Sequence, residues 1–213
     1  TFMPGMSWRP APGERDFNNF KWAFESKLTP RFNGKVPFFS YGNATASAVK
    51  NYREFMKKHG FEDSLLFGGL WLDVYNKYRN GILPDEHLAN ARKALENRLS
   101  YMDGVILTNS HMHRNPLKDY FLSVKFYPEL DEKYLAPMFE KVYSDPRFKG
   151  KMLGFNVRHC YVGHMSGVVE AEQGTLQLRE AMDTAMLYNP DIISLVEWNE
   201  ANENTSFQPS VLN

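Results

Sequence analysis

Glutamates, asparagines and a tryptophan are concentrated in one short segment, VEWNEANENT at residues 196–205, directly after an apolar run. Hydrolysis of a glycosidic bond needs two carboxyl groups, one that keeps its proton near neutral pH and one that acts as nucleophile or base. Neighbouring amides orient sugar hydroxyls, and an indole offers a flat apolar face to a sugar ring. We therefore expect Glu197 and Glu200 to be catalytic and Trp198 and Asn199 to bind substrate. The alternative is an acidic loop that is merely solvated.

A second polar cluster, TNSHMHRN at residues 108–115, contains His111 and His113. Residues two apart on an extended segment face the same side, so these histidines have the spacing of metal co-ligands. That interpretation predicts a metal-dependent hydrolase. An HxH pair is a weak motif, however, and histidines also donate hydrogen bonds to sugar hydroxyls. We expect His111, His113 and the neighbouring Asn109 to bind sugar, with no metal and no cofactor. In the metal alternative the third ligand comes from Asp73, His159, His164 or Glu197.

A third cluster, Arg158 and His159, follows the apolar run 152–157. Arg158 is expected either to hold a cleft carboxylate ionised or to form a structural ion pair at the rim. We include both residues among the candidate substrate-binding residues. Cys160 lies beside His159, but adjacent strand residues point to opposite faces, which disfavours a Cys-His nucleophile. A buried, inert thiol is expected instead.

Three more candidates follow apolar runs: Tyr41, Trp71 and Asp73. Each is a candidate sugar contact, although aromatic residues at strand ends are more often part of the core. The glycines Gly68 and Gly69 precede Trp71. We expect them to form a layer of small residues inside a barrel.

Short apolar runs alternate with patterns of helical spacing along the whole chain. This alternation predicts parallel strands joined by helical crossovers. The predicted strands are Val36–Tyr41, Leu65–Trp71, Gly104–Thr108, Met152–Val157 and Ile192–Val196, with a further strand end within Phe2–Trp8. The predicted helices are Ala46–Lys58, Asp85–Tyr101, Tyr134–Tyr143 and Thr175–Tyr188.

A (β/α)8 TIM barrel fits this α/β pattern better than an open doubly wound sheet. No GxGxxG or GxxxxGK[ST] motif opens a helix, and the chemically capable residues all follow strands, where barrel enzymes carry their sites. The runs are fewer than the eight of a full barrel. We therefore expect an incomplete barrel, with about six C-terminal βα units present and N-terminal strands missing. Residues 1–213 are expected to form one domain.

The composition narrows the function classes. Lys and Arg number 25, as do Asp and Glu, so no basic excess favours nucleic acid. No apolar run is long enough for a membrane span. A single cysteine excludes an internal disulfide and a CxxC site. We expect the partner to be an oligo- or polysaccharide, while the sequence leaves the compartment open.

The stretch from Leu178 to Pro209 resembles a signature of the glycoside hydrolase family 71/99-like proteins. There, a helix, Asn/Pro-Asp and a strand precede a segment of the type N-E-W-x-E-G-T-x-I-x-P. Glu197 to Glu200 match E-W-x-E, and Thr205 to Pro209 match the tail. The resemblance implies a retaining, endo-acting enzyme on α-linked mannan or glucan, with Glu197 assisting the substrate 2-hydroxyl and Glu200 as acid/base. The segment Pro4–Trp8 also resembles a PGxSW element of these proteins.

The sequence departs from that pattern in two places. Val196 stands where the motif has Asn, and residues 201–204 replace a single Gly, which brings in Glu203 as a further, solvated carboxylate. These departures keep open a non-catalytic carbohydrate-binding or polysaccharide-assembly protein on the same barrel. Residues 198–202 also resemble the W-N-E-P-N element of cellulase-like enzymes, a resemblance that likewise makes Glu200 the acid/base.

Overall fold

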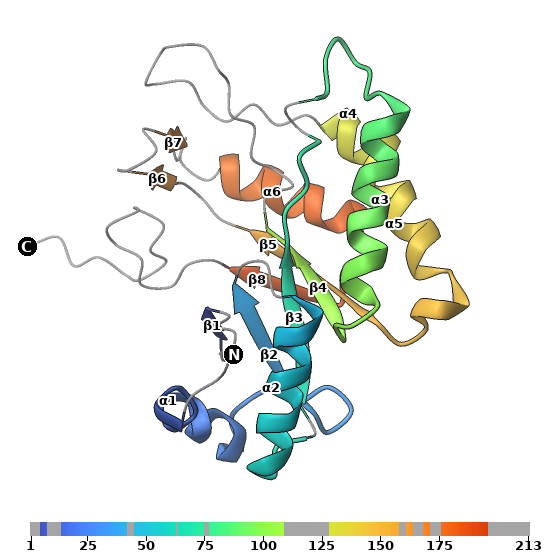
Figure 1. Ribbon diagram of the computed structural model, residues 1–213. Coiled ribbons are helices and arrows are strands. Elements are labelled where there is room, and N and C mark those ends of the chain that lie inside the picture. The colour runs from blue at the N-terminus through green and yellow to red at the C-terminus, as the bar shows by residue number, and fades with distance from the viewer. Residues whose placement is uncertain are drawn as a thin grey trace, which may run out of the picture.

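A computed structural model of the chain describes residues 5–7, 14–41, 45–62, 64–74, 77–108, 128–157, 161–163, 168–170 and 176–195. Within them, six parallel strands form one curled sheet, in which they follow one another in the order of the chain (Figure 1). This is the order expected of a partial TIM barrel. The strands are β1 (Gly5–Ser7), β2 (Val36–Tyr41), β3 (Ser64–Leu70), β4 (Gly104–Leu107), β5 (Met152–Val157) and β8 (Ile192–Leu195).

The strands form where the sequence is continuously apolar. The bounds of β2 and β5 are those predicted, β3 begins and ends one residue earlier than predicted, and β4 ends one residue earlier. Strand β8 begins as predicted, and its predicted last residue, Val196, lies outside the described residues. Strands that are covered on both faces need apolar residues at every position, which is why no alternation marks them. Leu66, Phe67, Ile106 and Phe155 are all fully buried.

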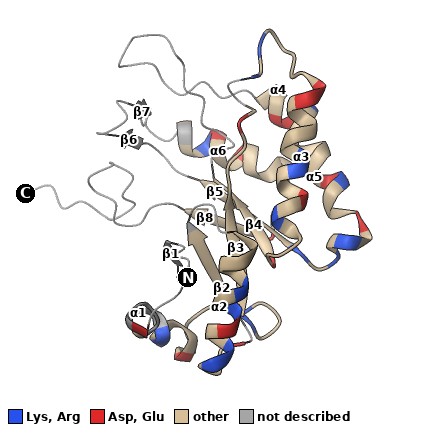
Figure 2. Cartoon of the chain, viewed as in Figure 1, with Lys and Arg blue, Asp and Glu red and all other residues tan. Residues whose placement is uncertain are grey.

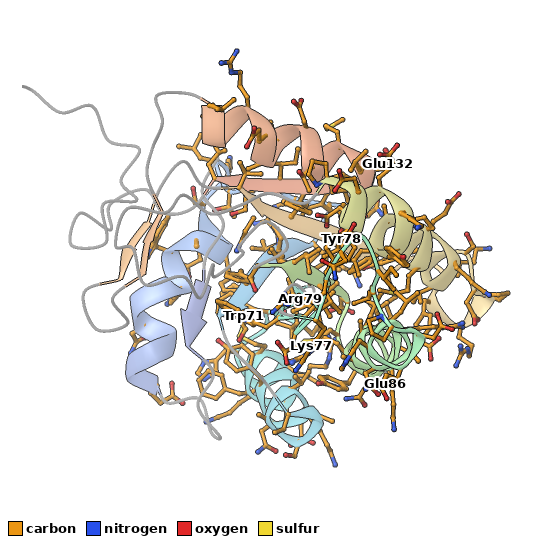
Figure 3. The ribbon with its side chains drawn as sticks, turned by 90° about the horizontal axis from the view of Figure 1, so that it is seen from above. Trp71, Lys77, Tyr78, Arg79, Glu86 and Glu132 are labelled. Atoms are coloured by element: carbon orange, nitrogen blue, oxygen red, sulfur yellow. The ribbon has the colours of Figure 1, made fainter. Side chains whose placement is uncertain are left out.

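Helices cover one face of the sheet, which we call the outer face. Tyr52 and Met56 of α2 (Ala46–Lys58) pack with Phe38 of β2 and Leu66 of β3. A second cluster contains Leu95 of α3 together with residues of β4, β5, α5 and α6. The helices are α1 (Glu14–Glu25), α3 (Asp85–Leu99), α4 (Pro128–Leu130), α5 (Ala136–Tyr143) and α6 (Leu176–Leu187). Figure 3, seen from above, shows the helices in an arc outside the strands.

Local signals fix the ends of α2. Thr45 is its N-cap, because the Thr45 hydroxyl accepts a hydrogen bond from the Ala48 N–H at 3.2 Å. The helix stops at His59 and Gly60, and Gly60 has a φ of 77°, a left-handed conformation that glycine adopts without strain. The predicted bounds of this helix are confirmed.

The predicted helix at Tyr134–Tyr143 begins earlier than its apolar spacing indicates. Residues from Pro128 onward are already helical, and Asp131–Leu135 form a wider π-helical turn before α5. Asp131 is buried in this turn and accepts a hydrogen bond from the Tyr188 hydroxyl. Because Tyr188 lies far away in the sequence, periodicity could not indicate that this carboxylate turns inward.

Gly68 does not lie in an inner layer, contrary to the prediction. A Cβ at this position would lie 2.8 Å from Cε of Met102 and 3.3 Å from Cδ of Arg98. Gly68 therefore faces the C-terminal part of α3, and its lack of a side chain lets that helix approach β3 closely.

Two smaller features complete the described part of the chain. Strands β6 (Tyr161–Gly163) and β7 (Val168–Glu170) form an antiparallel pair separate from the main sheet. Charges of both signs are spread over the helices, as Figure 2 shows, and no Lys, Arg, Asp or Glu occurs in β2, β3, β4, β5 or β8. None of the described helices has the length and apolarity needed to cross a bilayer.

Candidate functional site

The inner face of the sheet, opposite the helices, has a tightly packed apolar floor. A Cβ on Gly154 would lie 2.7 Å from Cγ1 of Ile106, and a Cβ on Gly104 would collide with the ring of Phe67. Phe67 of β3 and Ile106 of β4 thus lie on the inner face and fill the space above two glycines. In a barrel, this face becomes the interior, where side chains form layers.

A layer of polar side chains follows that floor at the carboxyl ends of the strands. Side chains alternate between faces, so Thr108, Asn156 and Ser194 project to the same side as Ile106, Gly154 and Ile192, respectively. Asn156 pairs in register with Ser194, and Thr108 and Asn156 come one residue after the pair formed by Leu107 and Phe155. We call Thr108, Asn156 and Ser194 the polar layer.

Thr108 ties two strand ends together. Its hydroxyl donates a hydrogen bond to the Leu70 carbonyl at 3.1 Å, and its backbone N–H reaches the same oxygen at 3.2 Å. These bonds hold the start of the segment after β4 against the end of β3. They also leave the lone pairs of the Thr108 hydroxyl available to accept a further hydrogen bond.

Asn156 is the least satisfied member of the polar layer. Its side chain is 3% exposed, and its Oδ1 atom has no hydrogen-bond partner among the described residues. Burying an amide oxygen without a partner costs about 1–3 kcal/mol. Such a group calls for a functional explanation.

Trp71 and Asp73 follow β3 at the same edge. Trp71 is 40% exposed and lies beside the strands in Figure 3, whereas the labelled Glu86 and Glu132 belong to the helical layer. Asp73 is exposed. Both candidates are therefore at the carboxyl edge and accessible to a ligand. Tyr41 ends β2 at this edge and pairs in register with Ser7 of β1.

The remaining predicted site residues lie outside the described residues. Their order in the chain still connects them to the carboxyl edge, because they follow Thr108, the end of β5 at Val157 and the end of β8 at Leu195. Their roles stay predictions. They are Asn109, His111, His113, Arg158, His159, Glu197, Trp198, Asn199 and Glu200.

The polar layer itself was not predicted as a site. One signal for it is present in the sequence: Asn156 is an amide in the otherwise apolar strand MLGFNV, one residue from its carboxyl end. An isolated polar residue in a strand buried on both faces needs a partner. The partner set of Thr108 and Ser194 comes from other strands, however, and only the sheet register shows it.

A cavity of about 600 Å³ lies elsewhere, on the helical side between α5 and the end of α6. Tyr143 lines it, and burial together with the nearby Asp191 carboxylate raises the pKa of this phenol far above its ordinary value. The Tyr143 hydroxyl donates to the Met152 carbonyl at 2.9 Å, which gives it a structural role. Because the cavity contacts the outer-face residue Leu153, it does not belong to the carboxyl edge. The described ranges also contain no group of three or more His, Cys, Asp or Glu side chains placed to hold a metal.

Comparison with solved structures gives a consistent match for this architecture. The GH99 endo-alpha-mannosidase from Bacteroides thetaiotaomicron superposes with a TM-score of 0.57 at 13% identity, covering 97% of this chain. The same enzyme in complex with bis-tris propane gives a TM-score of 0.56, also at 13% identity and 97% coverage. The chain has a GH99-like fold.

The GH99-like fold agrees with the family resemblance of the sequence. The chain spans 55% and 59% of the length of these two solved chains. No family model matches the chain, and no curated protein sequence matches it. The likeness is therefore one of fold, and it supports a partial TIM barrel.

Proposed function

We propose that the chain belongs to a glycoside hydrolase that acts on an α-linked, mannan- or glucan-like glycan. The observation that carries the proposal is the GH99-like fold, in which the strands β4, β5 and β8 lead directly into the polar segments of the sequence. Sites of barrel enzymes lie at this carboxyl edge. The E-W-x-E match falls two residues after β8.

Two glutamates carry the proposed chemistry. Glu200 donates its proton to the leaving glycosidic oxygen and later removes a proton from the incoming water. Glu197 takes the proton of the substrate 2-hydroxyl, so that the 2-oxygen attacks C1 as the leaving oxygen departs and a 1,2-anhydro sugar forms. Water, deprotonated by Glu200, then opens this ring at C1, and Glu197 returns the proton to the 2-oxygen. The reaction retains the configuration at the anomeric carbon.

The apolar strands of the sheet favour this chemistry. No charged side chain lies in β2, β3, β4, β5 or β8, so the charges of the site come from the segments after the strands. The apolar floor formed by Phe67 and Ile106 excludes water beneath the polar layer. Carboxylates above a water-excluding floor interact more strongly with a developing charge than they would in water.

Hydrolysis is tested by reducing-sugar release from α-mannans, α-glucans and β-glucans, measured with the full-length protein. Glu200→Gln and Glu197→Gln should each lower turnover about 100-fold or more, because each removes a proton-transfer group. Glu203→Gln is the matched control, since it makes the same change further along the segment and should retain turnover. Normal turnover in Glu200→Gln would contradict the proposed acid/base.

A second candidate function, carbohydrate binding without catalysis, is favoured by the places where the sequence departs from the family motif. Val196 stands in place of Asn, and residues 201–204 replace one Gly. Either change can misplace a catalytic carboxylate while leaving a sugar-binding edge. A non-catalytic carbohydrate-binding protein predicts no sugar release from any polymer, together with glycan binding that survives both Glu197→Gln and Glu200→Gln.

A further inference from the structure

We propose that Asn156 is a substrate-binding residue whose side-chain amide bonds a sugar hydroxyl at the bottom of the site. The inference rests on the proposed function, because it gives the ligand of that site a contact within the sheet itself. It concerns a residue that lies inside a strand, outside the polar segment that carries Glu197 and Glu200 in the sequence.

The first support is the state of the side chain. Asn156 is buried in β5, yet its Oδ1 atom has no hydrogen-bond partner among the described residues. A leucine or valine would fill a buried strand position without that penalty. Packing alone therefore does not explain an amide here, whereas a ligand that supplies the missing hydrogen bond does.

The second support is the pair of hydroxyl side chains next to Asn156. Thr108 and Ser194 flank it on the inner face, one on each neighbouring strand. The amide offers an acceptor and two donors, and each flanking hydroxyl can donate or accept. Carbohydrate hydroxyls both donate and accept, so they match this mixed set. A buried phosphate or carboxylate is stabilised most by cationic donors, and none occurs in these strands.

Ser40 provides a comparison, because it too is a buried polar residue but lies on the other face of the sheet. Ser40 also has a buried hydroxyl oxygen without a partner in the described structure, and it is 0% exposed. Ser40, however, shares a face with Val36 and Phe38, which pack against α2. It therefore points into the helical layer, away from the carboxyl-edge site. We expect Ser40 to matter for packing only.

The test measures stability and glycan binding in the same variants of the full-length protein. Asn156→Leu removes the amide at similar volume. The midpoint of urea unfolding should stay unchanged or rise, because the unsatisfied group is gone. Affinity for the best-bound polymer of the α-mannan and α-glucan panel should fall about ten-fold or more, measured by affinity electrophoresis. Ser40→Ala, the matched control, should bind like the wild type.

Asn156→Ser keeps a polar group of shorter reach, and it carries the comparison if the leucine variant unfolds. It too should lose affinity while keeping a normal midpoint. A lowered midpoint with unchanged affinity in the folded protein would assign Asn156 a structural role and overturn the inference.

The outcomes separate this inference from the proposed function. If Glu200→Gln abolishes sugar release while the Asn156 variants bind and turn over normally, the hydrolase stands and the inference is overturned. If wild type binds glycan without hydrolysing it and the Asn156 variants lose binding, the inference stands and the hydrolase is overturned. A wild-type protein that binds no polymer of the panel overturns both.

Discussion

Asp191 and Leu153 are joined by two hydrogen bonds. The Asp191 backbone N–H donates to the Leu153 carbonyl at 2.8 Å, and the Asp191 carboxylate accepts the Leu153 N–H at 2.8 Å. Asp103 and Leu66 form the same pair of bonds, at 3.0 and 2.8 Å. Asp191 immediately precedes β8 and bonds to β5, and Asp103 immediately precedes β4 and bonds to β3. The register of β8, and with it the start of the predicted catalytic segment, is thus fixed at its amino end.

Replacing Asp191 should weaken the sheet at the β5–β8 pair. Asp191→Ala leaves the Leu153 N–H without its acceptor, and we expect the free energy of unfolding to fall by about 1–3 kcal/mol. Urea unfolding measures this change. Asp183→Ala, an exposed aspartate on α6, is the control and should change stability by less than about 0.5 kcal/mol. Equal stabilities of the two variants would show that the Asp191–Leu153 hydrogen bonds do not stabilise the sheet.

Gly154 should tolerate no side chain while Ile106 is present. The added Cβ of Gly154→Ala would lie 2.7 Å from Cγ1 of Ile106, and overpacking of this kind costs about 1–3 kcal/mol. Combining it with Ile106→Ala should cost less than the sum of the two single changes, because each relieves the other. Additive losses in a double-mutant cycle would show that the two positions do not touch.

Trp71 should contribute to glycan binding from the edge of the site. Trp71→Ala is expected to lower glycan affinity about three- to ten-fold, because the exposed part of the indole offers a stacking surface. Trp22 is the matched control: it is 53% exposed but belongs to α1. Trp22→Ala should bind like wild type. If both variants bind equally well, Trp71 is no sugar platform.

The acid side of the stability curve should depend on Asp145. Hydrogen bonds from Arg147 hold the pKa of the Asp145 carboxyl below its ordinary value. A depressed folded-state pKa means that the stabilisation is present above the unfolded-state pKa, near 4, and is lost as the pH falls through the folded value. Arg147→Gln should therefore reduce stability at neutral pH slightly and flatten its decline below about pH 4. Unfolding midpoints measured from pH 2 to pH 7 test this. If stability declines with falling pH equally in Arg147→Gln and wild type, the Asp145–Arg147 interaction does not contribute to acid stability.

The sequence predicts most of the barrel elements because their signals are local. The continuous apolar runs of β2 and β5 and the cap and glycine of α2 lie within the elements themselves. Helix α1 was not predicted, since its segment ERDFNNFKWAFE carries two asparagines and exposes Trp22. Likewise, Asp131 in the π-helical turn is buried against Tyr188, a hydrogen-bond partner that no local pattern reveals.

The candidate site divides along the same line. Proximity of Trp71 and Asp73 to a strand end was predictable, and the structure places both at the carboxyl edge. The polar layer could not be predicted, because Thr108 and Ser194 become neighbours of Asn156 only through the pairing of the strands. The predicted catalytic pair Glu197 and Glu200 lies outside the described residues and awaits the substitutions above.

The sequential order of the strands has a consequence for how this protein is made. Each described strand of the main sheet after the first pairs with the main-sheet strand made before it, and only the separate β6–β7 pair comes between β5 and β8 in the chain. No described strand therefore depends on a first partner that is synthesised after it. As the chain leaves the ribosome, each new strand meets an edge that already exists, and its crossover helix seals the outer face behind it. Such growth keeps loop closures short, which favours rapid folding during translation. The last described strand of the main sheet, β8, is also the one that leads into the predicted catalytic segment, so that segment leaves the ribosome only after the other five strands of this sheet.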